Sequence, residues 1–148
     1  MKTISIFFLF INALIASENE EMLFRAKLQL VLHSTIPMVA MEHVGDDEAI
    51  TFLMMSIKRK FGSAADTETL SDIDKSIMSN ISYTYTRSAL EVTCQADNVK
   101  LATVIQDVCK QLKLILIVNS SAKFYFIPED VIIDTEKYEK NGIIYVKK

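Results

Sequence analysis

Two amphipathic segments of the chain match each other when the sequence is shifted by 55 residues. Apolar residues recur in each at three- and four-residue steps, as on the buried face of a helix, and the shift places Ala49 on Val104, Ile50 on Ile105, Leu53 on Val108, Met54 on Cys109 and Ile57 on Leu112. Any two amphipathic helices match at some offset, but here strand-like segments flank both helices as well. We therefore predict two β-α-β units in one compact α+β domain with small sheets and two main helices.

The two helices are expected at about Asp47 to Phe61 and at Val99 to Leu112. Asp46 or Asp47 can cap the first helix, and Gly62 is a natural stop for it. Asp97 or Asn98 is expected to cap the second helix.

Segments rich in apolar, aromatic and β-branched residues predict the strands. They are Ile36–Val44, Ile81–Thr86, Ala89–Gln95, Leu114–Val118 and Lys123–Ile127. Residues 63–80 are polar and acidic, so we expect a long surface loop that can include one short helical turn. The tail, with Val131–Ile133 and Ile143–Val146 around Asn141-Gly142, predicts a terminal β-hairpin.

The N-terminus predicts an export signal. Lys2 precedes an apolar run that ends at the small residues Ala16 and Ser17, and the acidic segment Glu18-Asn19-Glu20-Glu21 follows. The run is shorter than the ~20 apolar residues that a membrane span needs. An uncleaved anchor and a buried core helix are the alternatives. We expect a mature chain that is periplasmic or secreted and has no membrane span.

The chain thus divides into four parts. Residues 1–17 are the expected signal peptide, and residues 18–35 contain a helix with Leu23, Ala26, Leu30 and Val31 on one face. Residues 36–128 form the two-repeat domain, and residues 129–148 form the hairpin extension. The mature chain is of a size that buries one core.

Composition excludes several classes of protein. Apolar residues stay frequent up to Val146, which excludes a disordered chain. The net charge is −3, and the Lys and Arg residues are scattered, so nucleic acid is not an expected partner.

Two cysteines in an exported chain raise the question of a disulfide. Cys94 ends a predicted strand, whereas Cys109 lies about ten residues into the following helix, which carries it roughly 15 Å from the helix start. A disulfide needs Cα atoms within about 7 Å. We therefore favour two small buried core residues over a bond.

The second unit resembles the short N-terminal domain of secretins and TonB-dependent receptors. The likeness rests on Leu90 to Ile105, with Asn98-Val99-Lys100-Leu101 at the helix entry, and on Gln111 to Val118, which opens a strand. The first unit, Ile36-Pro37 through Phe61, is similar to a lead-in of related exported proteins. Lys113 replaces the usual glycine before the strand, and Asp46 replaces an apolar residue.

This resemblance implies a stand-alone, non-enzymatic docking module of the bacterial cell envelope. Its expected partners are other envelope or secretion-system proteins. Self-association through edge strands is also possible, because an exposed edge can accept a further strand. The candidate contact residues are Tyr83, Tyr85, Phe124, Tyr125, Phe126 and Tyr145, about half of which alternation assigns to the core.

A search for catalytic chemistry leads us to predict no catalytic, cofactor-binding or metal-binding residue, and no enzyme. His43 could join Asp46, Asp47 or Glu48 around a metal, but a capped helix start explains these acids. Cys109 is expected on a buried helix face with no histidine nearby in sequence. Only three glycines occur, so no phosphate-binding loop is expected.

Two alternative functions remain on the sequence alone. A small secreted enzyme or inhibitor would use the acidic corner Asp46–Glu48, and a structural subunit would assemble through the hairpin Val131–Val146. In a eukaryotic secretory route, Asn80-Ile81-Ser82 and Asn119-Ser120-Ser121 match the glycosylation pattern, although we interpret both as surface turns.

Overall fold

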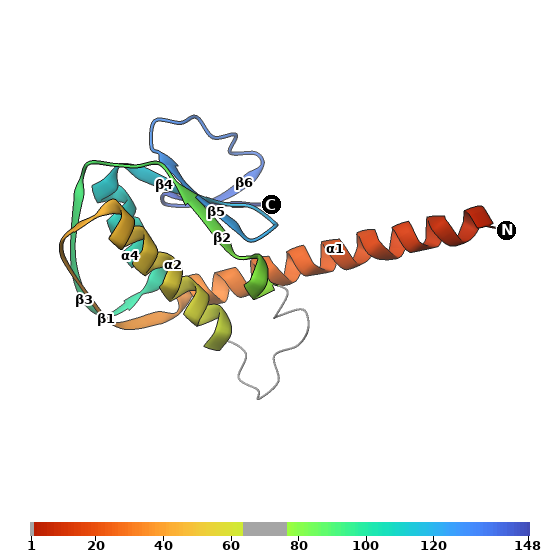
Figure 1. Ribbon diagram of the computed structural model, residues 1–148, viewed down its shortest axis with the longest axis horizontal. Coiled ribbons are helices and arrows are strands. Elements are labelled where there is room, and N and C mark those ends of the chain that lie inside the picture. Colours follow the sequence, from red (N-terminus) through yellow and green to blue (C-terminus); the bar gives the residue numbers. More distant parts are fainter. Residues whose placement is uncertain (1, 64–76) are drawn as a thin grey trace.

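The computed structural model describes the backbone of residues 2–63 and 77–148 and the side chains of residues 18–62 and 77–148. Its first element is a long helix, α1 (Lys2–His33), whose N-terminal part projects from the rest of the molecule (Figure 1). The predicted helix that ends at His33 is confirmed, and it continues N-terminally through the expected signal segment. Within the described part of the chain, no helix has an apolar stretch long enough to cross a membrane.

Both predicted β-α-β units are present in the order of elements. The first consists of β1 (Thr35–Gly45), α2 (Asp46–Ser63) and β2 (Ser82–Tyr85). The second consists of β3 (Glu91–Lys100), α4 (Leu101–Leu112) and β4 (Leu114–Val118). The two helices begin 55 positions apart, which is the predicted offset. The α+β class is confirmed.

Most of the predicted loop over residues 63–80 lies outside the described residues. Residues 77–80 form a short helical turn immediately before β2. This turn contributes Ile77 to the core, where its side chain is buried.

The first strands of the two units pair with each other and form a separate two-stranded antiparallel sheet. Strand β3 runs past its predicted end, because Met38 pairs with Asp97 and Ile36 with Val99. The predicted cap at Asp97 or Asn98 is therefore wrong. Lys100 precedes α4 and makes no side-chain cap, while the Leu101 N–H donates to the Ser34 carbonyl at 2.9 Å. A backbone carbonyl immediately before β1 thus satisfies one of the exposed helix amides.

The second strands of the units belong to a five-stranded sheet of order β2-β5-β4-β7-β6. It is completed by β5 (Lys123–Pro128), β6 (Tyr138–Asn141) and β7 (Ile144–Lys147). Strand β2 is parallel to β5, and β7 is parallel to β4, so the C-terminal hairpin completes this sheet.

The predicted hairpin turn is confirmed, but its first arm is wrong. Gly142 has φ +61 between β6 and β7, as the tight hairpin turn requires. The first arm is Tyr138–Asn141 and not Val131–Ile133. The Val131 N–H instead donates to the Pro128 carbonyl at 3.2 Å in a turn. The arm was missed because β6 is a polar edge strand without apolar alternation.

The core lies between the five-stranded sheet and the three helices. Helix α1 contributes Phe24, Leu28, Val31 and Leu32 to it. The apolar faces of α2 and α4 contribute the repeat positions, which are buried as predicted: Ala49, Ile50, Leu53, Met54, Ile57, Val104, Ile105, Val108, Cys109 and Leu112.

Helix α4 ends on a left-handed residue. Lys113 has φ 55 and ψ 41, and its N–H reaches the Cys109 and Lys110 carbonyls. Glycine adopts this conformation at no steric cost, whereas lysine does not. The position is therefore one that glycine suits better.

Candidate functional site

Asp46 and Asp47, at the start of α2, accept hydrogen bonds from the end of β2 and from the connection between β2 and β3. Asp46 accepts hydrogen bonds from the Asp47 and Ser88 N–H groups, at 2.8 and 2.6 Å. The Tyr85 hydroxyl donates to Asp47 at 2.7 Å, and this bond is the main cause that raises the pKa of Tyr85. The acids therefore act as capping and loop-binding groups in this structure.

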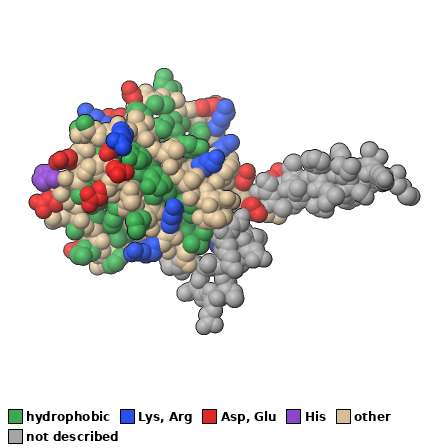
Figure 2. All heavy atoms as spheres, viewed as in Figure 1, with side chains coloured by type: hydrophobic (Ala, Val, Ile, Leu, Met, Phe, Trp, Pro, Cys, Tyr) green, Lys and Arg blue, Asp and Glu red, His purple; other side chains and the backbone are tan. Residues whose placement is uncertain are grey.

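His43 lies at an irregularity of β1, with φ 51, where the pairing register with β3 shifts. Its Nδ1 is 3.4 Å from Glu91, and its N–H donates to the Thr93 hydroxyl at 3.2 Å. Acidic side chains and a histidine gather at the end of the molecule away from the projecting helix (Figure 2). No group of three or more potential metal ligands occurs among the described residues.

The two cysteines are free and buried, as the strand and helix geometry predicts. Burial raises the pKa of Cys109 to about 12. Burial, together with a hydrogen bond to Asp107, raises the pKa of Cys94 to about 11. Both thiols are therefore protonated at neutral pH and are poor nucleophiles.

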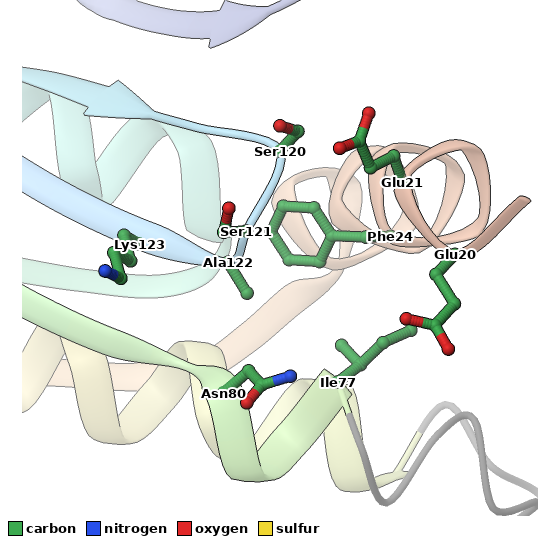
Figure 3. Close-up of a pocket in the computed structure, with 9 residues that line it drawn as sticks. All are labelled: Glu20, Glu21, Phe24, Ile77, Asn80, Ser120, Ser121, Ala122 and Lys123. Atoms are coloured by element: carbon green, nitrogen blue, oxygen red, sulfur yellow. The ribbon is translucent and has the colours of Figure 1, made fainter. Parts of the chain in front are cut away.

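A cavity of about 320 Å³ lies where α1 passes the turn between β4 and β5. Figure 3 shows Phe24 pointing from α1 toward this turn, while Glu20 and Glu21 extend in different directions at the rim. Two carboxylates that diverge do not form an acid and base pair. The cavity thus offers an apolar floor and a polar rim without visible catalytic geometry.

Asn80 and Ser120, which come from the two glycosylation patterns, both line this cavity. The Asn119 side chain accepts hydrogen bonds from the Ser121 and Lys123 N–H groups, each at 3.0 Å. Asn119 therefore has a structural role in the turn between β4 and β5.

At Thr93, the backbone edge of the two-stranded sheet is hydrogen-bonded by a side chain and cannot pair with a further strand. Its backbone N–H donates to the side chain of Gln111 at 2.9 Å, and its carbonyl accepts from the same amide at 2.9 Å. Gln111 also donates to Asp107 at 3.2 Å. One glutamine of α4 thus occupies both backbone groups that an added strand would use.

The structure divides the six predicted contact residues into three groups. Phe124 and Phe126 are fully buried, so they belong to the half that alternation assigns to the core and are not contact residues. Tyr83 and Tyr85 lie on the same sheet face as these phenylalanines and reach α2: Lys58 Nζ is 6.0 Å from the Tyr83 ring centroid, and Tyr85 bonds Asp47. Tyr125 and Tyr145 lie on the opposite face.

That opposite face forms a continuous apolar surface across three strands. Ile117 of β4 lies opposite Tyr125 of β5 on one side and opposite Tyr145 of β7 on the other. Ile115 lies opposite Ile127 in the neighbouring row. We call these five residues the outer face. It lies opposite the face that meets the helices, where the Phe124 ring contacts Phe24 of α1.

The outer face is separate from the main core. Ile115 and Ile117 are only 5 and 9 % exposed, yet they do not belong to the core cluster that contains Leu114, Leu116 and Val118. Tyr125, Ile127 and Tyr145 beside them are half-buried. Strands β5 and β6 are parallel and lie on either side of β4 and β7, so their connection crosses the sheet on this face, because the helices occupy the other. The connection from β5 to β6 begins at the edge of this face and carries Ile132, which is 97 % exposed.

Sequence reasoning did not place Ile115, Ile117 and Ile127 together on a second face of the sheet. A signal was present in Leu114–Val118, where five apolar residues occur in succession and all five are buried. Such strands are typical of sheets that are covered on both faces. Assigning the residues to one sheet face also requires the strand order, which local patterns do not give.

The outer face can bind but shows no group for chemistry. Its polar atoms are two tyrosine hydroxyls, and Lys140 Nζ lies 5.6 Å from the Tyr145 ring centroid. Of its five side chains, only those of Tyr125, Ile127 and Tyr145 are partly accessible, so these are the ones that can contact another macromolecule. A comparison of the chain with protein-family models, with curated proteins and with solved structures finds no match.

Proposed function

We propose that this chain is an exported, non-enzymatic docking module of the cell envelope that binds another protein. The observation that carries this proposal is the outer face, a row of two tyrosines around Ile117 on the sheet side away from the helices. Tyrosine is enriched where proteins bind each other, because it combines a large apolar ring with a polar tip.

The arrangement of titratable groups supports a binding role over a catalytic one. The acids of the α2 corner are bound to Ser88 and Tyr85, and the thiols are protonated. His43 has Glu91 beside it, but both side chains are well exposed.

Export is supported by the way α1 is divided. The apolar run ends at Ala16-Ser17, and among the residues whose side chains are described, from Glu18 on, Phe24 is the first in the buried core cluster. Cleavage there would leave Glu18, Glu20 and Glu21 in the first turn of the shortened helix, where carboxylates favour the positive end of the helix dipole.

Site-specific photocrosslinking in the cell that makes this protein tests the docking function. A photoreactive amino acid is placed at Ile132, which is 97 % exposed beside the outer face, and at Met55, which is 59 % exposed on α2. A discrete crosslinked protein, identified by mass spectrometry, supports the function. If neither position gives a crosslinked protein and the chain stays a free monomer, docking is wrong.

N-terminal sequencing of the mature protein tests export independently. We expect the mature protein to begin at Ser17 or Glu18, after a cut beside the small residues Ala16 and Ser17. Recovery of the chain with its first residues intact contradicts a cleaved signal.

A further inference from the structure

We propose that the edge of β3 beside α4 binds an extended, acidic segment of the partner protein as an added strand. This inference rests on the docking function proposed above and assigns to it a second contact surface besides the outer face. Three observations carry it: a cavity between β3 and α4, backbone groups of β3 that point away from β1 along this cavity, and a lysine that lines it.

A cavity of about 340 Å³ lies between β3 and α4, and all of its lining residues belong to these two elements. Ala96 and Val99 of β3 and Val104 of α4 give it apolar surface, while Asp107 and Lys110 of α4 give it charge. Ligand pockets range over roughly 300 to 1,000 Å³. The cavity is therefore of a size for one short stretch of chain.

The edge of β3 along this cavity carries backbone groups that point away from β1. Thr93 directs both its N–H and its carbonyl to Gln111 of α4. Because these directions alternate along an antiparallel strand, Gln95 and Asp97 direct their N–H and carbonyl groups to the same side as Thr93. Within the described part of the chain, nothing bonds these groups of Gln95 and Asp97. Such an edge can pair with a further strand.

Both ends of this open edge are defined by the structure. At one end, the Gln111 amide already occupies the backbone of Thr93. At the other end, Asn98 has φ 49, which interrupts the extended backbone. The open part therefore runs from Gln95 to Asp97 and can pair with about three residues of a partner.

The cavity lies where alternate side chains of an added strand would point. Cys94 and Ala96 both line it, and the Cys94 side chain reaches Asp107 of α4. Side chains of neighbouring strands that lie opposite each other point to the same sheet face. A partner residue opposite Ala96 would therefore place its side chain over the cavity, where a small aliphatic group suits the apolar lining.

Lys110 favours an acidic segment. Its side chain is exposed, lines the cavity and makes no ion pair within the described residues. Asp107, the carboxylate of the same cavity, already accepts hydrogen bonds from Gln111, at 3.2 Å, and from Cys94. A carboxylate of the partner segment would therefore complement Lys110.

Short synthetic peptides test the proposal with the full mature protein in NMR titrations. Each has five residues that alternate Val and Thr, with Glu added at either the first or the last position. We expect one of the two peptides to bind about threefold more tightly than its Gln counterpart, since an exposed ion pair contributes only modestly. Binding should slow amide exchange at Gln95 and Asp97, because their N–H groups become hydrogen-bonded.

N-methylation of the peptide tests for strand pairing. An antiparallel strand with Val over the cavity would bond β3 through its Thr residues, whereas a parallel strand would bond through its Val residues. We expect methylation of one set to weaken binding by about tenfold, because it removes backbone donors. Methylation of the other set should have little effect.

Two variants test the residues that define the surface. Lys110→Glu is expected to remove the preference for Glu over Gln, whereas Arg59→Glu, the same charge reversal on an exposed position of α2, should keep it. Gln111→Ala frees the backbone of Thr93, so lengthening the peptide to seven residues should tighten binding about fivefold in this variant and not in the unmodified protein. Thermal unfolding shows whether each variant keeps the fold.

Several results would overturn the proposal. They are no binding at millimolar peptide, equal effects of the two methylation patterns, or amide changes confined to other surfaces. A concentration-dependent dimer that slows exchange at Gln95 would assign the edge to a second copy of this chain. Crosslinking in the cell at Ile132 or Met55, but not at a photoreactive amino acid in place of the exposed Thr103, would keep the docking function while removing this surface from it.

Discussion

Phe24 of α1 stacks on Phe61 of α2, with ring centroids 5.7 Å apart and ring planes inclined by 8°. Phe24 also meets Phe124 of β5 edge-on at 6.5 Å. One aromatic side chain thus joins the N-terminal helix, the first repeat helix and the sheet. The segment after the expected cleavage point is therefore part of the core.

Phe24→Ala is expected to destabilise the fold by about 3 to 5 kcal/mol, because a fully buried phenylalanine leaves a cavity among rigid neighbours. Urea unfolding followed by circular dichroism measures the change in the free energy of unfolding. Met22→Ala on the same helix is the control, since Met22 is 66 % exposed and its loss should change stability by less than about 0.5 kcal/mol. Equal stability of the two variants would mean that α1 does not pack as described.

Gln111→Ala is expected to lower stability by roughly 1 kcal/mol, because it leaves the Thr93 N–H and carbonyl without the two bonds of 2.9 Å. Amide hydrogen exchange at Thr93 should become faster in this variant. Gln111→Glu keeps the acceptor for the N–H but loses the donor to the carbonyl, so it should retain slow exchange better than the alanine variant. The exposed Lys110→Ala is the control on the same helix. Unchanged exchange at Thr93 in all variants would contradict the pairing.

The helices and most strands could be predicted because their signals are local. The face of α2 with Ile50, Leu53 and Ile57 repeats every three or four residues, and β1 and β5 are strand-like in composition. The offset of 55 residues between the two helices could also be predicted from local pattern. Helix α2 begins directly after β1 ends at Gly45, and α4 begins directly after β3 ends at Lys100.

The errors arose where tertiary pairing outweighed local preference. Asp97 and Asn98 are good cap residues, but pairing with β1 keeps this segment extended as far as Lys100. The outer face depends on β7 lying beside β4, and these strands are joined by neither a turn nor a direct crossover. No local pattern around Ile117 or Tyr145 specifies that neighbour.

The thiol groups should make stability fall at alkaline pH. Burial raises the pKa of the Cys94 thiol to about 11 in the folded chain, above the value of 9.0 for an unperturbed thiol. Its pKa is raised on folding, so its contribution is fully present below pH 9 and is lost as the pH rises toward 11. Urea midpoints measured across this range should decline less steeply for Cys94→Ala than for the unmodified protein. Parallel curves would show that the Cys94 thiol has an ordinary pKa.

Iodoacetamide provides a second measurement of the same two thiols. At neutral pH the folded protein should react slowly at both Cys94 and Cys109, because only the thiolate is nucleophilic and both side chains are buried. In urea, both should react rapidly, as free thiols. Rapid labelling of the folded chain would contradict their burial, and two unreactive cysteines in urea would indicate a disulfide.

Lys113→Gly is expected to stabilise the protein by about 0.5 to 1 kcal/mol, because lysine pays a steric cost for its left-handed conformation at φ 55 that glycine avoids. Glycine is also more flexible in the unfolded chain, which offsets part of the gain. The matched control is Lys110→Gly, three positions earlier and inside α4, where the same substitution should cost roughly 1 kcal/mol of helix propensity. The two variants should therefore shift the thermal midpoint in opposite directions. A lower midpoint for Lys113→Gly would mean that the Lys113 side chain makes a compensating contact, or that α4 does not end in the left-handed conformation.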